Sequence, residues 1–332
     1  MNPSTRITDG GPIPAFDRVV PDGGYRWWYV DGVSDDGRHA IVLIAFVGSV
    51  FSPWYAGARA RGRAEAAAHC ALNVAIYSPG QNRWAMTERD EAAIEREPSR
   101  FRIGPSTILA RPQSLRLEID ERGSPLPRKI IGSVTVHADH WFDQEYSLAQ
   151  GDRHWWHPLA PGARIEVRFD HPSLSWQGRA YVDSNHGSEP LEHGFAHWYW
   201  QRTMDHGATR VAFVTTPRSG AGVELGLRFG ADGCVNAEQL APEVRLSPSG
   251  WRIEQIARAD ADRPCRVLRR LEDTPFYSRT ELGLHLDGRP LQAIHESLSL
   301  DRFSQPVVQW MLPFRAPRMR SSWRRLLRTE RI

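Results

Sequence analysis

Two short segments of the chain concentrate side chains that can hold or transfer a proton. The first contains His154 and Trp156, and the second, further along the chain, contains Tyr181 and Asp183. Side chains two residues apart on an extended strand point to the same face. If both segments are strands, an imidazole, an indole, a phenol and a carboxyl group can meet around one cavity. Such a set suits acid–base chemistry, with the carboxyl group and the imidazole as the proton carriers.

The aspartate is the most informative member of this set. Asp is depleted in strands, so Asp183 near the end of the segment Arg179–Ser184 calls for an explanation. A structural alternative exists, because the run from Asp183 to Gly187 also suits a turn in which Asp183 caps a loop. Likewise, the Trp-rich segments His154–His157 and His197–Trp200 also suit packing in a core or an interface.

A metal site is a further alternative for the histidines. His193 and His197 stand at positions i and i+4, and His154, His157 and His186 are also available. None of them has a Cys partner or a recognised metal-ligand spacing, and His193-Gly194 is typical of a loop. We therefore expect no metal.

Length and composition limit the function classes. A chain of 332 residues exceeds one ordinary domain, and 41% apolar residues suffice for a sizeable core. The net charge of +3 is too small to indicate nucleic-acid binding. Three widely spaced cysteines without a CxxC motif argue against disulfides and favour a reducing, cytoplasmic compartment. The longest apolar run, Ala40–Val47, is far shorter than the roughly 20 residues of a membrane-spanning helix.

The elements that must position the candidate residues are mostly strands. Turn residues separate apolar segments at intervals of about 8–15 residues without regular strand–helix alternation, which favours antiparallel sandwiches or barrels. Between the first strands we expect helices at Ala58–Ala71 and at Thr87–Arg96, where Thr87 and Asp90 resemble a capping box. The predicted strands are Tyr25–Asp31, His39–Val47, Cys70–Ser78, Ser114–Asp120, Ile130–Ala138, Arg164–Asp170, Trp176–Ser184, Phe195–Thr203, Thr209–Thr216, Gly222–Phe229, Val244–Leu246, Trp251–Ala257, Cys265–Arg270, Ser278–Leu286, Leu291–Leu300 and Val307–Phe314.

The strands fall into two halves, which predicts two domains. We expect a flexible segment over residues 1–24, a first barrel-like domain over 25–190, a second over 191–314, and a basic tail over 315–332. The chain lacks the GxGxxG, P-loop, HExxH and GxSxG motifs, so nucleotide cofactors, zinc proteolysis and the α/β-hydrolase nucleophile have no support.

The two candidate segments resemble the carotenoid 1,2-hydratases, also called hydroxyneurosporene synthases. The resemblance lies in Arg153–Pro158 and Gly178–Glu192, and it extends over about residues 25–205. Further matching runs are Tyr25–Tyr29, Cys70–Tyr77, Arg102–Ser106 and Trp198–Trp200.

The resemblance implies two lipocalin-like domains and an all-β, mainly antiparallel fold. It implies a hydro-lyase that adds water to the terminal C-1/C-2 double bond of acyclic carotenoids such as neurosporene and lycopene, without organic cofactor or metal. The functional residues of the family carry over to His154, Trp156, Tyr181 and Asp183. We expect the aromatic residues Trp155, Trp198 and Trp200 to line the substrate site.

The chemistry of hydration suits these side chains. Protonation at C-2 leaves a tertiary cation at C-1, which water then attacks. A carboxyl group has an ordinary pKa of about 4, so burial in an apolar barrel must raise that pKa if Asp183 is the acid. Trp156 and Tyr181 can stabilise the cation through their ring faces. His154 can accept a proton from water, or it can hydrogen-bond Asp183 and tune its acidity.

The substrate of such an enzyme is dissolved in a membrane, so the basic tail is of interest. Residues 315–332 contain seven Arg and one Glu, and Met319, Trp323, Leu326 and Leu327 fall on one helical face. This pattern predicts peripheral contact with an anionic, inner photosynthetic membrane, and a solvated tail is the alternative. Two other functions stay open: a lipocalin-like carrier of carotenoids or other lipids, and a pericyclase-type enzyme on the same scaffold. The sequence indicates no oligomeric state.

Overall fold

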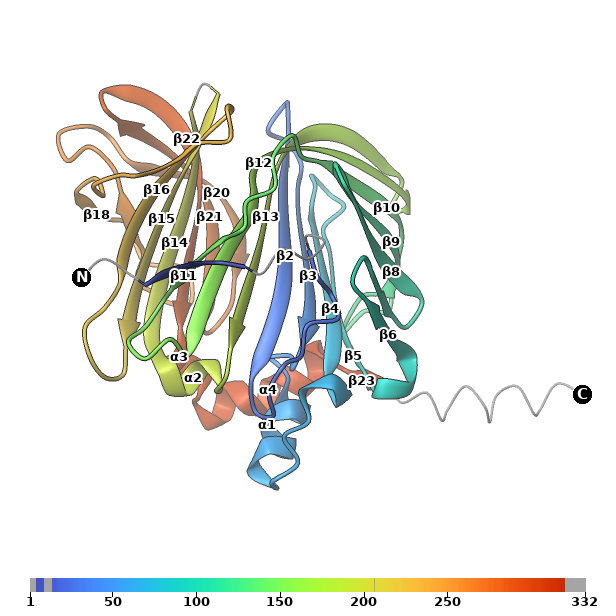
Figure 1. Ribbon diagram of the computed structural model, residues 1–332. Helices are drawn as coiled ribbons and strands as arrows, with labels where there is room; N and C mark the ends of the chain where they lie inside the picture. The colour runs from blue at the N-terminus through green and yellow to red at the C-terminus, as the bar shows by residue number, and fades with distance from the viewer. Residues whose placement is uncertain (1–3, 9–13, 206, 320–332) are drawn as a thin grey trace, which may run out of the picture. The chain divides into compact units, whose positions relative to one another are not determined.

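The structure is a computed structural model that describes residues 4–8, 14–205 and 207–319 (Figure 1). The chain divides into two compact units. The larger unit comprises Arg6–Glu145, Trp156–Pro190 and the segment from Trp310 onward, and the smaller unit comprises the N-terminal residues to Thr5, Tyr146–Trp155 and Leu191–Gln309. Both are built from strands, and nearly all strand pairs are antiparallel, so the expectation of an all-β fold is confirmed.

The larger unit carries most of a 14-stranded sheet whose main path runs β23-β5-β4-β3-β2-β13-β12-β10-β9-β8-β7-β6. Its strands are β1 (Thr5–Ile7), β2 (Tyr25–Ser34), β3 (Ala40–Val47), β4 (Cys70–Tyr77), β5 (Arg83–Arg89), β6 (Ile94–Glu97), β7 (Arg100–Ile103), β8 (Ser106–Arg111), β9 (Ser114–Arg122), β10 (Lys129–His137), β11 (Gln144–Ser147), β12 (His154–His171), β13 (Leu174–Gly187) and β23 (Arg318–Met319). Its helices are α1 (Pro53–Ala60) and the 3₁₀ turns η1 (Ala66–Ala68) and η2 (Glu91–Ala93).

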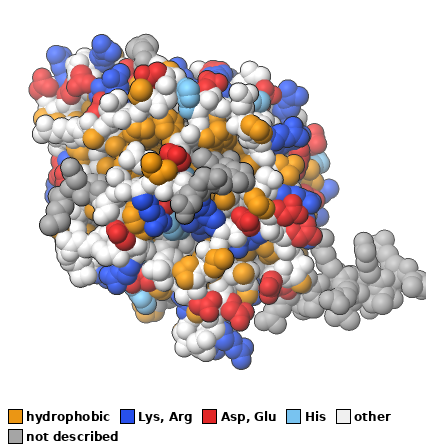
Figure 2. Space-filling view, in the orientation of Figure 1, with side chains coloured by type: hydrophobic (Ala, Val, Ile, Leu, Met, Phe, Trp, Pro, Cys, Tyr) orange, Lys and Arg blue, Asp and Glu red, His pale blue; other side chains and the backbone are white. Residues whose placement is uncertain are grey.

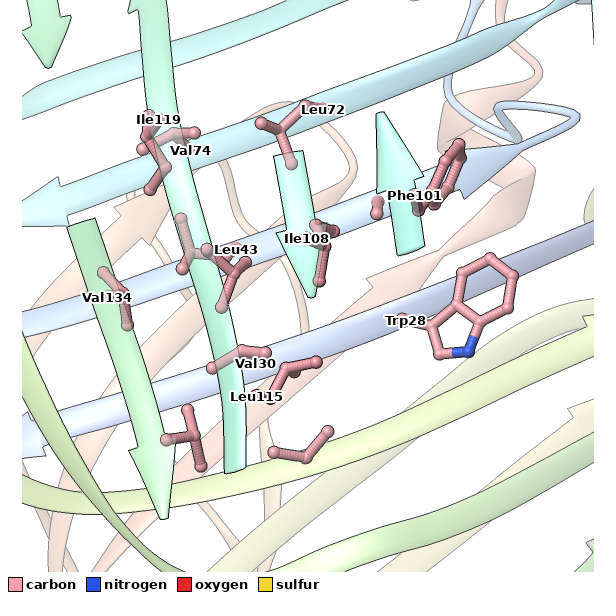
Figure 3. Close-up of a cluster of buried hydrophobic side chains, with 14 of the residues drawn as sticks. Trp28, Val30, Leu43, Leu72, Val74, Phe101, Ile108, Leu115, Ile119 and Val134 are labelled. Atoms are coloured by element: carbon pink, nitrogen blue, oxygen red, sulfur yellow. The ribbon is translucent and has the colours of Figure 1, made fainter. Parts of the chain in front are cut away.

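Alternation of side chains places the core of the larger unit on one face of this sheet. In β9 the apolar residues Leu115, Leu117 and Ile119 are buried, whereas the intervening charged residues are exposed. Figure 3 shows Leu115 and Ile119 on the same side of the sheet as Val30 of β2 and Leu43 of β3, with which they share one core. Alternation of buried and exposed residues is expected for an antiparallel strand that has one face on the core and the other in contact with water.

Three neighbouring strands depart from this alternation. β3 reads AIVLIAFV with every residue but one buried, and β4 is buried throughout. β2 likewise has nine buried residues among ten. Strands covered on both faces read as continuous apolar runs. The face of β2 opposite to the core is therefore also shielded from water.

A buried ion pair links two strands that are distant in the sheet order. Arg89 of β5 donates to both carboxylate oxygens of Glu121 in β9, at 2.8 and 3.0 Å. Ser106 adds a hydrogen bond of 3.0 Å to the same carboxylate. Burial raises the pKa of Glu121, and the Arg89 charge opposes that rise. The pair therefore joins β5 to β9, which are separated by six strands in the sheet order.

The smaller unit is a seven-stranded antiparallel sheet in the order β17-β16-β15-β14-β22-β21-β20, with a separate two-stranded ribbon. Its strands are β14 (Phe195–Asp205), β15 (Ala208–Pro217), β16 (Glu224–Gly230), β17 (Val235–Ala237), β18 (Glu243–Arg245), β19 (Ile256–Arg258), β20 (Arg266–Asp273), β21 (Tyr277–Leu286) and β22 (Arg289–Ser299). The helices are α2 (Leu191–Gly194), α3 (Leu300–Phe303) and α4 (Pro306–Arg315), and α4 spans the boundary between the units. The smaller unit has a hydrophobic core of its own, which includes Leu282, Leu284 and Ala293.

Three sequence-based predictions of elements were wrong. The strand expected over Trp251–Ala257 is present only in its last two residues, because β19 begins at Ile256. The helix expected over Thr87–Arg96 is instead the end of β5, the turn η2 and the strand β6, because residues up to Arg89 pair with β4. The strand expected over Val307–Phe314 is the helix α4, since a short apolar run does not distinguish the two structures. The helix expected over Ala58–Ala71 is present only as α1, which starts earlier, and η1.

Two surface properties bear on the environment of the protein. Among the described residues, no helix combines the length and the apolar character needed to cross a membrane. On the face in Figure 2, basic and acidic side chains are interspersed with hydrophobic groups.

Candidate active site

Asp183 lies in the middle of a buried strand, not in a turn. It belongs to β13, which pairs antiparallel with β2 so that Asp183 stands opposite Tyr29 and Tyr181 stands opposite Asp31. Because pairing continues to Gly187, the turn that the local sequence also allowed does not form. The strand fixes Tyr181 and Asp183 on one face.

Two hydrogen bonds converge on one oxygen of this aspartate. The Tyr181 hydroxyl donates to Asp183 Oδ2 at 2.9 Å, and Trp156 Nε1 donates to the same atom at 2.9 Å. Trp156 lies on β12, the neighbour of β13 in the sheet. The structure therefore brings together three of the four predicted functional residues through direct contacts.

All three side chains are removed from water. Tyr181 and Trp156 are fully buried, and Asp183 is 6% exposed. Burial disfavours an ionised carboxyl group, whereas donors aimed at it favour the ionised form. The Asp183 site contains both influences, burial and two aimed donors.

The Asp183 site faces away from the core of the larger unit. Val182, the neighbour of Asp183, belongs to that core, as do Trp28 and Val30 of β2. Tyr181, Asp183 and Tyr29 alternate with these residues and therefore occupy the opposite face. The barrel interior that the sequence predicts around Asp183 is therefore not observed, because strand parity alone does not reveal which face is the interior.

Two residues of this face were missed from the sequence. The Tyr29 ring lies edge-on to the Tyr181 ring at a centroid distance of 6.2 Å. Asp31 is fully buried and stands opposite Tyr181 in the register of β2 and β13. The available signal was an acidic residue in a strand that is otherwise apolar and aromatic, the same signal that singled out Asp183.

His154 begins β12 and lies two residues before Trp156. The imidazole is fully buried and packs on the Phe195 ring with centroids 4.6 Å apart. Position 194 is a glycine because a β-carbon there would collide with His154 Nε2. Phe195 and Gly194 thus fix the position of this ring.

The three tryptophans expected to line the substrate site are buried within the smaller unit. Trp155 Nε1 donates to the Asp152 carbonyl at 2.8 Å. Trp198 and Trp200 share one face of β14, and the Trp198 ring packs edge-on against Phe213 at 5.6 Å. Trp198 and Trp200 are directed away from the face of β14 that carries Tyr199 and Gln201.

Two further histidines form a separate cluster on the core side of the larger unit. A ring nitrogen of His157 lies 3.7 Å from a carboxylate oxygen of the fully buried Glu145, and a ring nitrogen of His186 lies 3.8 Å from the other oxygen. Both histidines point to the face of their strands opposite to the face that carries Trp156 and Asp183. Burial lowers the pKa of His157 to about 4 and also lowers that of His186. Among the described residues, no group of three or more His, Cys, Asp and Glu side chains is arranged to hold a metal ion.

Comparison with known proteins identifies the family. Residues 43–325 match the family described as carotenoid hydratase CrtC. The acyclic carotenoid 1,2-hydratase of Thiocapsa roseopersicina is 43% identical over 95% of this chain and 81% of its own length. That of Rubrivivax gelatinosus is 43% identical over 92% of this chain and 76% of its own. The chain belongs to the carotenoid hydratase family. The hydratase of Cereibacter sphaeroides matches as well, at 38% identity over 85% of this chain and 99% of its own length.

Solved structures show the fold. The chain CghA, crystallised with Sch210972, aligns with a TM-score of 0.54 at 11% identity, covering 92% of this chain and 99% of that chain. Kievitone hydratase from Nectria haematococca aligns with a TM-score of 0.51 at 10% identity, covering 90% of this chain and 98% of that chain. This family member therefore shares a lipocalin-like fold with proteins of very different sequence.

Proposed function

We propose that this protein is an acyclic carotenoid 1,2-hydratase that acts by acid catalysis at Asp183. The observation that carries the proposal is the buried Asp183 carboxyl group with the Trp156 and Tyr181 donors on one oxygen. Membership of the carotenoid hydratase family supplies the substrate class, an acyclic carotenoid such as neurosporene or lycopene.

The first step is protonation of the terminal double bond. The Asp183 proton, carried on Oδ1, is transferred to C-2, and the π electrons form the new C–H bond. Positive charge then develops at C-1, a tertiary centre. As the proton leaves, negative charge spreads to Oδ2, where the Tyr181 hydroxyl and the Trp156 indole stabilise it. Donors placed where charge develops lower the barrier most effectively.

The cation must survive until water reaches it. Aromatic faces stabilise a desolvated cation by about 2 kcal/mol or more without forming a covalent bond. Tyr181, Trp156 and Tyr29 provide aromatic surface next to the acid. Their burial also limits the water that would divert the cation.

The second step is attack of water at C-1. Oxygen forms the bond to C-1, one proton leaves the water for a base, and the base passes this proton back to the carboxylate of Asp183, which restores both groups. We assign the acceptance of this proton to His154, because a neutral imidazole suits that role near pH 7. The other role for His154, tuning the acidity of Asp183, is distinguished by kinetics: loss of a base lowers the rate of water capture, whereas altered acidity shifts the pH profile. We assign Trp155, Trp198 and Trp200 to substrate contact.

An acyclic carotenoid substrate supports a location of the protein near a membrane. We infer peripheral contact with an anionic lipid surface on the cytoplasmic side of the inner, photosynthetic membrane, where acyclic carotenoids are dissolved. The free cysteines Cys70, Cys234 and Cys265 are compatible with a reducing compartment.

The deciding experiment uses purified protein with lycopene in detergent and no added cofactor. Chromatography with mass detection should find a product heavier by one water. An Asp183→Asn variant, which keeps the shape of the side chain, should bind lycopene without converting it. Equal product from both proteins would overturn the assignment of Asp183. Binding without conversion in either protein would indicate a carrier, and an isomer of unchanged mass would indicate pericyclase chemistry.

A further inference from the structure

The helix α4 is apolar on all sides. Its residues Pro306–Arg315 read PVVQWMLPFR. Leu312 packs inward, as does Ala316 just after the helix. On the other side, Trp310 is 70% exposed and Phe314 is 61% exposed. A helix that is apolar all round is normally buried in protein or lipid, so water is not the expected environment of this outer side.

The outer side of α4 is part of a larger exposed surface of the larger unit. The Trp310 and Phe314 rings pack edge-on at 5.4 Å. Trp54, at the start of α1, donates from Nε1 to the Ala316 carbonyl at 2.9 Å, and Ser124 donates to the Phe314 carbonyl at 2.6 Å. We call this surface the aromatic patch; its exposed members are Trp54, Leu126, Trp310, Met311, Phe314 and Met319.

Several arginines belong to the segments that form or follow the aromatic patch. The Arg315 guanidinium lies 4.2 Å above the Trp84 ring, next to the end of α4. Arg61 and Arg63, which follow α1, are exposed. In the sequence, the 13 residues that follow Met319 contain five Arg and a single Glu. Trp, Phe and Met beside arginines are the composition of surfaces that bind the headgroup region of anionic membranes.

We propose that the aromatic patch is the surface on which this protein docks to an anionic lipid membrane. The proposal rests on the proposed function, since a carotenoid dissolved in the bilayer must be reached from its surface. Trp54, Trp310 and Phe314 enter the interface, and the arginines contact the lipid phosphates. A second copy of the chain is disfavoured as the occupant, because a two-fold contact through this surface would bring the same arginines together.

The test compares vesicle binding of the full-length protein and of the double variant Trp310→Ser, Phe314→Ser. The vesicles contain equal parts phosphatidylcholine and phosphatidylglycerol, and binding is measured by co-sedimentation. We expect the partition coefficient of the double variant to fall about tenfold or more, because two aromatic anchors are lost. Trp251→Ser, which removes a half-exposed tryptophan of the smaller unit, is the matched control and should bind like the unaltered protein.

Two further readouts separate this proposal from the proposed function. Hydration of detergent-dispersed lycopene and the melting temperature should be unchanged in the double variant, whereas hydration of lycopene held in vesicles should fall. Equal vesicle binding by the double variant and the unaltered protein would overturn the docking surface even if hydration proceeds. A dimer that becomes a monomer in the double variant, with unchanged vesicle binding, would assign the aromatic patch to self-association instead.

Discussion

Tyr181 and Asp183 lie two residues apart on β13, and the phenol donates a 2.9 Å hydrogen bond to the carboxylate oxygen of its neighbour. A strand gives this pair one face and one register, so the acid and its donor are positioned by the backbone itself. The indole of Trp156 reaches the same oxygen from β12. The proposed proton transfer therefore depends on a geometry that two adjacent strands maintain.

Replacement of Asp183 by Asn should abolish hydration while leaving the fold intact. The amide keeps the volume but carries no transferable acidic proton. General acid catalysis contributes about 10²–10⁴-fold, so we expect a loss of at least that size in kcat. Circular dichroism and lycopene binding serve as the controls. A variant that retains full activity would show that another group protonates C-2.

Replacement of Tyr181 by Phe should weaken the acid without removing it. The ring remains next to the Tyr29 ring, but one of the two donors on Oδ2 is lost. We expect kcat to fall about 10- to 100-fold, as for loss of one donor to developing charge. The alkaline limb of the pH–rate profile should move to higher pH, because the carboxylate is less stabilised. An unchanged profile with a raised KM would instead indicate a role in substrate binding alone.

Substitution of Gly194 tests whether the position of the His154 ring matters, without altering the imidazole itself. In Gly194→Ala the new methyl group would collide with His154 Nε2 and displace the ring. We expect activity to fall and the free energy of unfolding to drop by about 1–3 kcal/mol, as for overpacking. Gly57→Ala is the matched control, because the added methyl meets only the flexible Arg61 side chain. That control should be neutral or stabilising, since alanine favours a helix.

Stability should depend on pH through buried neutral histidines. Burial lowers the pKa of His157 in the larger unit and of His295 in the smaller unit to about 4, from 6.5. Below pH 6.5 the unfolded chain takes up protons that the folded chain does not. Stability is therefore full above about pH 6.5 and is lost as pH falls towards 4, by up to about 3 kcal/mol for each histidine.

Urea unfolding at pH 7, 6 and 5 measures this effect. His157→Gln should flatten the pH dependence, whereas His137→Gln, at a half-exposed position, should leave the dependence unchanged. If the free energy of unfolding fell equally with pH in the unaltered protein and in His157→Gln, His157 would not be a source of the pH dependence.

The sequence predicts where most strands lie along the chain, but it does not predict which face of a strand is buried in the core or which strands are neighbours. Alternating Leu115, Leu117 and Ile119 mark β9, and the parity of Tyr181 and Asp183 places both on one face. Parity does not state which face is the core, because β13 is buried on both sides of Asp183. The apolar run that forms α4 suits strand and helix equally, so its local pattern does not decide between them. The hydrogen bond from Trp156 to Asp183 needs sheet order, which local patterns do not encode.

Salt should separate two contributions to membrane docking. Attraction between arginines and anionic lipid is screened as ionic strength rises, with a Debye length of about 8 Å at physiological salt. Burial of aromatic side chains in the interface is much less sensitive to salt. A chain ending at Met319 lacks five Arg of the C-terminal segment. Its vesicle binding should be weaker at low salt and should show a shallower salt dependence than that of the full chain.

The double variant at Trp310 and Phe314 should bind more weakly than the unaltered protein at every salt concentration. Its salt dependence of vesicle binding should have the same slope as that of the unaltered protein. If both variants changed the slope equally, the aromatic residues and the arginines would not make separable contributions, and the assignment of Trp310 and Phe314 as interfacial anchors would fail.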